Sequence, residues 1–464
     1  MRHVDLCVIG SGSGNSIIDD RFADRSVALI DDGVLFGGTC LNHGCIPTKM
    51  FVRPASVIRS VAEAARVNIT ADQVVGDWAA VRDRVFGRID PIAAAGEAWR
   101  AESEQVALYR TRARFTGPRT LAVGEETLTA DAVVIAAGSR AVLPPVPGLA
   151  EAFADGVAHT SDTIMRLDRQ PASMIILGSG FVAAEFGHVF SSFGTRVTVC
   201  LRGDRMLRHA DRDISARFTT GISSAVSLVE SFTATGVTSD AEGVVVRGTT
   251  AGGQELELGA ACLLVAVGRI PNSDRLDVAR AGVAVNEAGF IEVDAHQRTS
   301  AAGVWALGDI CSPWMLKHVA NREARTVAHN LLHPDDLRTT DHRAVPYAVF
   351  GHPEVASVGL TEDEARAAGH DIAVGMKPYS DTAAGWARED TTSLAKVIAD
   401  RRTGMILGAH IVGPQAASLI QPVVQAMATD VDAATLARVP YWIHPALTEV
   451  VENALLALDL PGQS

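Results

Sequence analysis

Short apolar runs that end at glycines recur along the first 270 residues of the chain. The run from Val4 to Ile9 ends at a glycine-rich turn, and the run from Met174 to Leu177 ends at a second one. We expect each turn to open a helix, and each is followed by another apolar run, 26–30 or 196–201. Strand, glycine turn, helix and strand in this order are typical of nucleotide-binding units with a parallel sheet. The pattern therefore predicts two such units in one chain.

Other segments predict a helix, a linker and a third unit. Apolar residues recur at helical spacing between 77 and 101, and prolines cluster at 144–147. After residue 340 strands and helices no longer alternate strictly. Residues Thr361 to Glu364 match a capping box, and the apolar runs 394–399 and 406–412 flank a turn that is typical of a hairpin. We therefore expect an α/β chain that ends in an α+β unit.

Composition and charge exclude several classes of protein. The chain has 464 residues and a formal charge of −13, and a negative surface repels phosphate backbones. We therefore expect neither a nucleic-acid partner nor a membrane partner, and no apolar stretch is long enough for a span. The first residues are typical of a buried strand rather than of a signal peptide, which favours the cytoplasm. Six cysteines in a chain of this length are too few for a disulfide scaffold.

The first glycine turn has the spacing of a phosphate-binding loop. Gly10, Gly12 and Gly14 let the backbone turn tightly and approach a pyrophosphate at a helix N-terminus. Asp31 ends the next strand about 20 residues later, where a carboxylate can accept a hydrogen bond from a ribose hydroxyl. Asn15 stands in place of the last glycine of the usual pattern. A glycine turn that binds no phosphate is the alternative interpretation.

The second glycine turn predicts a different nucleotide. Gly178 and Gly180 repeat the spacing, but the next strand ends at Leu201 without an acid. Three arginines follow: Arg202, Arg205 and Arg208. Guanidinium groups suit a ribose 2′-phosphate, so the sequence favours NADPH over NADH. The alternative is three solvated surface arginines.

Two cysteines five residues apart carry the most specific signal. Cys45 precedes Pro47 in what we expect to be a first helical turn, where the helix dipole stabilises a thiolate. Cys40 lies before it and Lys49 about one turn after it. Lysine occurs elsewhere in the chain only at 317, 377 and 396, so Lys49 stands in a region that is otherwise free of lysine. The alternatives are two buried free cysteines or a metal site, and a metal site lacks further ligands at suitable spacing.

A histidine near the C-terminus resembles a base with its orienting acid. His444 is followed by Pro445 and a run with helical spacing, and Glu449 lies about one turn inside that run. A carboxylate there can accept a hydrogen bond from the imidazole and set its tautomer. A helix-capping histidine with an ordinary first-turn acid is the equal alternative on spacing alone.

Taken in order, these motifs resemble the disulfide-reductase branch of the pyridine nucleotide–disulfide oxidoreductases, the relatives of glutathione reductase and dihydrolipoamide dehydrogenase. The similarity covers essentially the whole chain. The motifs are the first glycine loop, Gly37-Gly38-Thr39-Cys40 with Cys45, Ala137-Gly138, Val267-Gly268-Arg269-Ile270-Pro271-Asn272, Gly303 to Asp309, and His444 to Glu449.

The resemblance implies cofactors, domains and roles. It implies an FAD-binding domain from 1–148 with 272–340, an NADPH-binding domain over 149–271 and a dimerisation domain over 341–464. FAD would contact Gly10, Gly12, Gly14, Asp31, Gly38, Thr39, Lys49, Gly138 and Asp309. NADPH would contact Gly178, Gly180, Arg202, Arg208 and Gly268. Cys45 would face the flavin, Cys40 would exchange with a small disulfide substrate, and Lys49 would pair with Glu185. The His444–Glu449 pair would come from the other subunit of a homodimer.

Three stretches outside the generic motifs resemble the branch of the family that reduces mycothione: 12–19, 85–92 and 441–447. Mycothione carries hydroxyls and no carboxylates. The carboxylates of Asp19 and Asp20 could therefore accept hydrogen bonds from mycothione, whereas they would repel glutathione disulfide. The alternative interpretation is that both are solvated acids at the start of a helix. Dihydrolipoamide dehydrogenase and glutathione reductase-like activities are the nearest rivals. A redox-silent flavin-binding scaffold is the alternative from another class. The remaining cysteines, Cys7, Cys200, Cys262 and Cys311, are expected to be small core residues.

Overall fold

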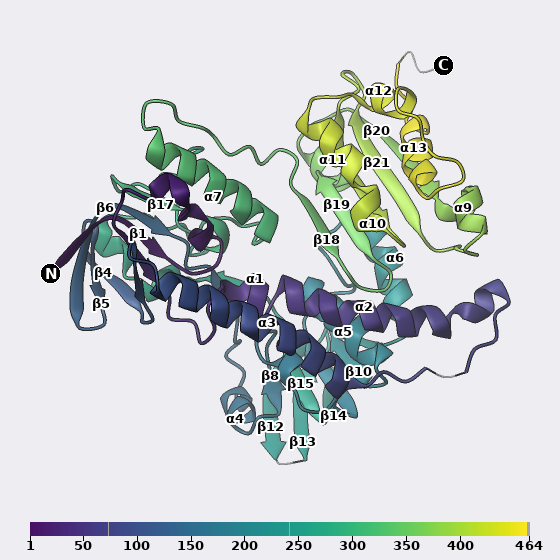
Figure 1. The fold of residues 1–464 in the computed structure, drawn as a ribbon. Coiled ribbons are helices and arrows are strands. Elements are labelled where there is room, and N and C mark those ends of the chain that lie inside the picture. Colours follow the sequence, from purple (N-terminus) through teal and green to yellow (C-terminus); the bar gives the residue numbers. More distant parts are fainter. Residues whose placement is uncertain (73, 241, 462–464) are drawn as a thin grey trace.

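The computed structural model describes residues 1–72, 74–240 and 242–461 of the chain. Three lobes are visible in Figure 1, and the helices α2 (Cys45–Ala62) and α3 (Trp78–Ala101) run side by side across the middle of the molecule. The N-terminus and the C-terminus lie in different lobes. Across the described residues, we find no helix with the length and apolar character that crossing a membrane requires.

The first sheet is built around the first predicted strand. Its order is β3-β2-β1-β6-β5-β4, and β17 pairs with β6. The core of the sheet is parallel, with Ile9 of β1 beside Ile30 of β2 and Ile135 of β6. Its strands are β1 (Arg2–Ile9), β2 (Val27–Ile30), β3 (Val106–Tyr109), β4 (Ala113–Gly117), β5 (Thr120–Val123), β6 (Glu126–Ile135) and β17 (Val304–Ala306).

The second sheet repeats the same parallel plan. Its order is β11-β10-β9-β15-β8, and a three-stranded antiparallel sheet lies beside it in the chain. The strands of the parallel sheet are β8 (Ala158–His159), β9 (Ser173–Leu177), β10 (Arg196–Cys200), β11 (Ser227–Val229) and β15 (Cys262–Val265). Those of the antiparallel sheet are β12 (Thr233–Asp240), β13 (Gly243–Thr249) and β14 (Glu255–Ala260). A short pair, β7 (Ser139–Ala141) with β16 (Arg269–Pro271), joins the two regions.

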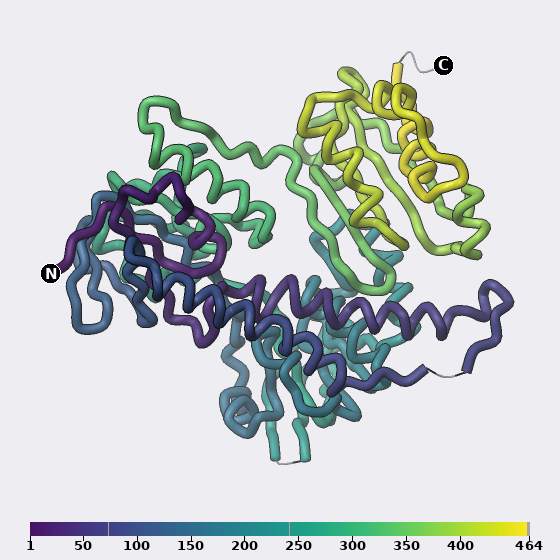
Figure 2. The backbone as a smooth tube through the Cα atoms, viewed as in Figure 1, coloured from purple at the N-terminus to yellow at the C-terminus, as the bar shows by residue number. Residues whose placement is uncertain are grey.

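The third sheet is antiparallel and belongs to the C-terminal lobe. Its order is β18-β19-β22-β21-β20, and the predicted hairpin is its β21–β22 pair. The strands are β18 (Pro346–Val349), β19 (Val355–Gly359), β20 (Ile372–Pro378), β21 (Leu394–Asp400) and β22 (Ile406–Val412). Figure 2 shows the long connection that leads from α7 (Lys317–Leu332) into this lobe. The α/β class with an α+β C-terminal unit is therefore confirmed.

The remaining helices cover these sheets. They are α1 (Gly38–Asn42), α4 (Leu149–Ala154), α5 (Phe181–Ser192), α6 (Arg212–Ile222), α8 (Glu362–Ala367), α9 (Ala383–Trp386), α10 (Ala416–Leu419), α11 (Gln421–Ala428), α12 (Ala433–Arg438) and α13 (Thr448–Leu456). The predicted helix over 77–101 is α3, with Asp77 as its N-cap. The predicted capping box opens α8, and both of its reciprocal hydrogen bonds are present.

The predicted α-helix after the first glycine loop is wrong. Two short 3-10 helices stand there instead, η1 (Gly14–Ile17) and η2 (Asp20–Phe22). Between them Ile18 and Asp19 have extended backbones, with ψ of 93° and −174°. The chain therefore turns away before a full α-helical turn can form.

Side chains explain this interruption. The carboxylate of Asp19 accepts from the backbone N–H of Arg21 at 3.0 Å, a local bond that competes with a helix. The buried guanidinium of Arg100 donates to the carbonyl oxygens of Asn15 at 3.1 Å and Ile18 at 2.7 Å. In an α-helix those carbonyls would accept from residues four positions further along. Arg100 therefore satisfies the backbone that the missing helix leaves free.

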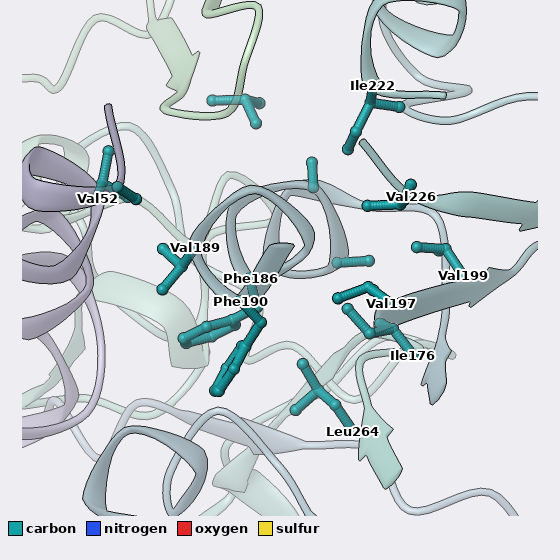
Figure 3. Close-up of a cluster of buried hydrophobic side chains, with 14 of the residues drawn as sticks. Val52, Ile176, Phe186, Val189, Phe190, Val197, Val199, Ile222, Val226 and Leu264 are labelled. Atoms are coloured by element: carbon teal, nitrogen blue, oxygen red, sulfur yellow. The ribbon is translucent and has the colours of Figure 1, made fainter. Parts of the chain in front are cut away.

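The helix α5 is packed between α2 and the second parallel sheet. Figure 3 shows Phe186, Val189 and Phe190 of α5 between Val52 of α2 and strand residues that include Ile176. All of these residues are buried. This packing fixes the helix that follows the second glycine loop against the helix that carries Cys45.

The predicted domain boundaries are consistent with the sheets but stay a prediction. Residues 2–135 and 304–306 share the first sheet, residues 158–265 build the second region and 346–412 the third sheet. Residues 462–464 of the predicted third domain lie outside the described part of the chain.

Candidate active site

A cavity of about 1590 Å³ contains both glycine loops and both cysteines of the predicted redox pair. Most of the predicted site residues line it: Gly10, Gly12, Asp31, Gly38, Thr39, Cys40, Cys45, Lys49, Gly138, Gly178, Gly180, Glu185, Arg202, Arg208, Gly268 and Asp309. Gly14, His444 and Glu449 do not belong to its lining. The fold therefore brings residues from distant parts of the sequence, between Gly10 and Asp309, to one space.

The first glycine loop touches the cysteine segment backbone to backbone. Gly10 has a φ of 114°, and a Cβ there would collide with the carbonyl of Ala136. A Cβ on Gly38 would stand 2.7 Å from the Cα of Gly12. The N–H of Gly37 donates to the hydroxyl of Ser11 at 2.8 Å. Glycine is therefore required at Gly10 and Gly38 for the close approach of these loops.

Gly14 and Asp31 of this region contact other parts of the protein. Gly14 was predicted to contact the cofactor, but it packs against the sheet, where a Cβ would stand 2.6 Å from that of Ala136. Asp31 accepts from the backbone N–H of Ser11 at 2.8 Å and from the guanidinium of Arg110 at 2.7 Å. Its carboxylate is thereby held in the lining of the cavity.

The two cysteines are free thiols in this structure and hydrogen-bond to each other. Cys45 is the first residue of α2, as the sequence predicts. The hydrogen bond from Cys40 and the charge of Lys49 lower the pKa of the Cys45 thiol to about 7. The same hydrogen bond, with burial, raises the pKa of Cys40. In the reduced pair the negative charge is therefore placed on Cys45.

Lys49 and Glu185 form the ion pair that the family resemblance implies. The Nζ of Lys49 lies 2.8 Å from both carboxylate oxygens of Glu185, which is 3% exposed. The backbone N–H of Phe350 donates to Glu185 at 2.9 Å, and Lys49 lies 4.7 Å from the centre of the Phe350 ring. Phe350 of the C-terminal lobe thus contacts both members of the ion pair.

A second hydrogen-bonded group surrounds Asp309. Its carboxylate accepts from the hydroxyl of Ser139 at 2.7 Å, and Arg269 donates to the same hydroxyl at 2.9 Å. Asp309 stands in η7 (Gly308–Ile310), directly after β17. Ser139 is 130 positions from Arg269 and 170 from Asp309, and the β7–β16 pair brings it beside Arg269.

The arginines after β10 divide into two kinds. Arg202 and Arg208 are exposed and line the cavity near the second glycine loop. Arg205 lies outside the lining and pairs with Asp204 at 3.3 Å. Gly180 at the start of α5 has open space where a Cβ would stand. Two cations and an open helix N-terminus therefore face the same space.

His444 and Glu449 contact each other but lie away from this chain's cavity. The Nδ1 of His444 is 2.8 Å from a carboxylate oxygen of Glu449, and this contact engages one of the two ring nitrogens. The imidazole is 71% exposed, whereas the Glu449 side chain is only 17% exposed. Exposed apolar residues precede it: Val439, Tyr441 and Ile443.

Cys200 belongs to the cavity lining, whereas the acids at 19 and 20 and the three cysteines Cys7, Cys262 and Cys311 lie outside it. Burial raises the pKa of Cys7, Cys200 and Cys262 to about 12, and it raises that of Cys311 as well. Asp19 does not line the cavity and forms an ion pair with Arg21 at 2.7 Å. Its carboxylate is thus already engaged. Across the described part of the chain, no cluster of three His, Cys, Asp or Glu residues is placed to hold a metal ion.

Sequence reasoning missed several residues of this site. They are Arg110, Ser139, Arg269, Lys317 and Phe350. Arg269 directly follows Gly268 in a family motif, and the scarcity of lysine marks Lys317. The other three carry no local signal, because their contacts come from distant elements.

Comparisons with known proteins agree with this arrangement. Residues 4–324 match the family model described as pyridine nucleotide-disulphide oxidoreductase, and 345–455 match its dimerisation domain. The chain is 50% identical to a mycothione reductase of Mycobacterium tuberculosis over 99% of this chain and 100% of that one. It is 32% identical to a dihydrolipoyl dehydrogenase of Thermus scotoductus over 99% and 98% of the two chains. A solved structure, the HOCl-induced flavoprotein disulfide reductase RclA of Escherichia coli, superimposes with a TM-score of 0.84 at 27% identity, over 97% and 99% of the chains.

The chain belongs to the pyridine nucleotide–disulphide oxidoreductases, so the family resemblance of its sequence is confirmed. FAD and a nicotinamide nucleotide are the cofactors that this family implies. The residues present fit a flavin dinucleotide, because Gly10, Gly12 and Gly38 leave side-chain-free backbone at the first loop. Asp31 and Asp309 both line the cavity, and their carboxylates can accept hydrogen bonds from hydroxyl groups.

Proposed function

We propose that the chain is an NADPH-dependent reductase of mycothione, the disulfide of mycothiol, and that it works as a homodimer. The observation that carries the proposal is the 50% identity over the whole chain to a protein named mycothione reductase. The cavity shared by two nucleotide loops and a cysteine pair supports disulfide reduction as the reaction. The overall reaction is NADPH plus H⁺ plus mycothione to NADP⁺ plus two mycothiol.

The nucleotides would be held by the two glycine loops. Gly10, Gly12 and Asp31 would bind the flavin dinucleotide, and Gly178 with the nearby arginines would bind NADPH. When bound, the flavin would supply two-electron transfer between the nicotinamide nucleotide and the cysteine pair. Lys49, fixed by Glu185, keeps a positive charge beside Cys45 and so favours its thiolate.

The two cysteines divide the exchange with the substrate between them. The sulfur of Cys40 attacks one sulfur of mycothione, so a mixed disulfide forms and the substrate S–S bond breaks. The departing thiolate takes a proton from His444 of the partner subunit, whose tautomer Glu449 sets. Cys45 then attacks the Cys40 sulfur, releases the second thiol and restores the protein disulfide.

A homodimer is favoured by the position of the histidine. His444 is exposed and lies outside the cavity that its own cysteines line. The neighbouring Val439, Tyr441 and Ile443 are 73%, 104% and 74% exposed, so a partner would bury apolar surface here. The match of residues 345–455 to a dimerisation domain supports the same assembly.

Steady-state kinetics with a panel of disulfides tests the proposal. We expect the purified holoenzyme to reduce mycothione with NADPH far faster than glutathione disulfide or lipoamide, and to use NADH poorly. Cys40→Ser and Cys45→Ser should each abolish mycothione reduction, because neither variant can form the protein disulfide. Cys262→Ala is the matched control, since Cys262 is a buried core residue.

Two results would contradict the proposal. Preference for lipoamide with NADH would identify a dihydrolipoamide dehydrogenase. A holoenzyme that NADPH does not reduce would be a redox-silent flavin-binding scaffold.

A further inference from the structure

A buried carboxylate holds the backbone directly before Asp309. Glu323 of α7 is 1% exposed, and its Oε2 accepts from the backbone N–H of Gly308 at 2.6 Å. Gly308 is the first residue of η7 and has a φ of 75°, a conformation that favours glycine. Asp309 follows it and lines the cavity. The hydrogen bond from Gly308 therefore fixes the turn that presents the Asp309 carboxylate.

The second oxygen of the Glu323 carboxylate has a partner as well. Its Oε1 lies 3.1 Å from the Nε2 of His342. His342 stands on the connection between α7 and β18, and it lines the same cavity as Asp309. Each carboxylate oxygen of Glu323 thus has a hydrogen-bond partner from a different segment of the chain, and together these partners set the orientation of the side chain.

A negative charge at this buried position costs free energy. Burial raises the pKa of the Glu323 carboxyl, and the charge of Asp309 adds to that rise, whereas the N–H of Gly308 and His342 oppose it. An apolar side chain would avoid the cost of burying a charge. It could not accept from Gly308, however, and the buried N–H of that residue would lose its acceptor. The carboxylate therefore serves the backbone of the turn.

We propose that Glu323, oriented by His342, is a positioning residue for the flavin dinucleotide, because it sets the place of Asp309 through the backbone of Gly308. The inference rests on the flavin site of the proposed function. The side chain of Asp309 is held separately, by the hydroxyl of Ser139 at 2.7 Å. The backbone of the turn and the carboxylate that it presents are thus fixed by different elements, α7 and β7. The competing role for Glu323 is to stabilise the fold without any effect on the flavin.

Release of FAD from the holoenzyme tests the proposal. The enzyme is held in urea below its unfolding transition, flavin fluorescence follows FAD as it leaves, and far-UV circular dichroism shows that the fold is retained. We expect Glu323→Ala to release FAD roughly ten- to a hundredfold faster, because the N–H of Gly308 loses its acceptor. Glu323→Gln should restore most of the slow release, since its amide oxygen can still accept from Gly308.

Glu354→Ala is the matched control for the loss of a carboxylate. Glu354 accepts from the backbone N–H of Ala417 at 2.7 Å, but it does so within the C-terminal lobe. Its replacement should leave the rate of FAD release as in the unmodified enzyme. An equal acceleration in Glu354→Ala and Glu323→Ala would overturn the proposal, because any weakened fold would then release the flavin.

A double-mutant cycle shows whether Glu323 acts through Asp309. Asp309→Asn alone should release FAD faster, and adding Glu323→Ala should then change the rate little, because the carboxylate that the turn presents is already gone. Two effects that multiply would overturn the proposal, and so would unchanged release in either single variant. Should Glu323→Ala fail to fold, His342→Ala decides, since it removes one partner of the Glu323 carboxylate. Faster release that disappears in the Asp309→Asn background supports the proposal, and any other result overturns it.

Neither NADPH nor mycothione is present in this assay. A wrong assignment of the disulfide substrate would therefore leave the rates of FAD release as expected, and it would appear only in the kinetics with the panel of disulfides.

Discussion

The ammonium of Lys49 and the carboxylate of Glu185 are in contact through both oxygens, at 2.8 Å each, although the residues are 136 positions apart. The pair connects the helix that begins at Cys45 with the helix that begins after the second glycine loop. Phe350 completes it from the C-terminal lobe, with its backbone N–H on Glu185 and its ring beneath Lys49. All three lobes therefore meet at this one charge pair.

Neutralising Glu185 should slow the reduction of the enzyme by NADPH. Glu185→Gln keeps the shape but removes the charge that holds Lys49, and a hydrogen bond to a charged group contributes about 1.5–3 kcal/mol. We therefore expect roughly a tenfold or larger loss in the rate of the NADPH half-reaction, measured by stopped-flow absorbance of the flavin. Glu151→Gln, at an exposed position of α4, is the matched control. A rate equal to that of the control would show that the pair only supports the fold.

The reactivity of Cys45 should change with pH near neutrality. Its pKa is lowered to about 7 by the hydrogen bond from Cys40 and by Lys49, so the thiolate dominates above pH 7 and the thiol below it. In the reduced enzyme we expect the rate of Cys45 alkylation to fall about tenfold for each unit well below that value. Lys49→Met removes a cation that favours the thiolate and should raise the midpoint. A midpoint near that of an ordinary thiol in the unmodified enzyme would contradict this account.

The sequence predicts those parts of the site that depend on short spacing. The two glycine loops, the cysteine pair with Lys49 and the His444–Glu449 contact each lie within ten residues of sequence, so short spacing marks them. For His444 and Glu449, the choice over a helix-capping histidine also needed the family resemblance. The strand at 4–9, the helix at 77–101 and the hairpin at 394–412 follow from periodicity for the same reason.

Long-range contacts account for what sequence reasoning missed. The backbone N–H of Phe350 has no signature, and it matters only because the fold places it on Glu185. The helix expected after Gly10 fails because Arg100, 85 positions away from Asn15, supplies alternative hydrogen bonds. Gly14 belongs to the first glycine loop, and its close approach to Ala136 and Val8 has no signature in the local sequence.

Two of the three arginines after β10 should set the preference for NADPH. Arg202→Ala and Arg208→Ala each remove a cation from the cavity wall, and a charge-assisted hydrogen bond to a 2′-phosphate contributes about 1.5–3 kcal/mol. We expect kcat/KM with NADPH to fall roughly ten- to a hundredfold, while kcat/KM with NADH stays the same. Arg205→Ala is the matched control, since Arg205 pairs with Asp204 outside the cavity lining. Equal losses with both nucleotides would refute a role in 2′-phosphate recognition.

Lys396 should be a strong determinant of stability. Its side chain is 1% exposed, and its Nζ lies within 3.0 Å of Asp211, Asp213 and Glu362. The ion pairs with Asp211 and Asp213 connect the third sheet to the second region. Lys396→Met leaves the buried carboxylate of Asp211 without its cation, which should cost about 3–5 kcal/mol. Thermal unfolding of the holoenzyme should show a clear drop in Tm. Lys377→Met is the control, because the Nζ of Lys377 lies 3.6 Å from the carboxylate of Asp381 in a looser ion pair, and its loss should change Tm little. Similar drops in Tm in both variants would contradict the prediction.

His444→Ala should slow the reduction of mycothione but not the reduction of the enzyme by NADPH. A general acid contributes about 10²–10⁴-fold, so we expect a loss of that size in mycothione reduction. The rate at which NADPH reduces the enzyme should stay unchanged, because His444 gives its proton only later, to the thiolate that leaves the substrate disulfide. Glu449→Gln should have a smaller effect of the same kind, since the glutamine can still hold the ring but no longer stabilises its positive charge.

Subunit mixing shows which chain supplies the histidine. Cys40→Ser and His444→Ala are each expected to be inactive as homodimers. After the two are mixed and exchanged at equal amounts, half of the dimers carry one site with an intact Cys40 and an intact His444 from opposite chains. Activity should therefore return to about a quarter of that of the unmodified enzyme, as twofold symmetry requires. If the histidine acted within its own chain, every mixed site would lack one of the two residues and no activity would return.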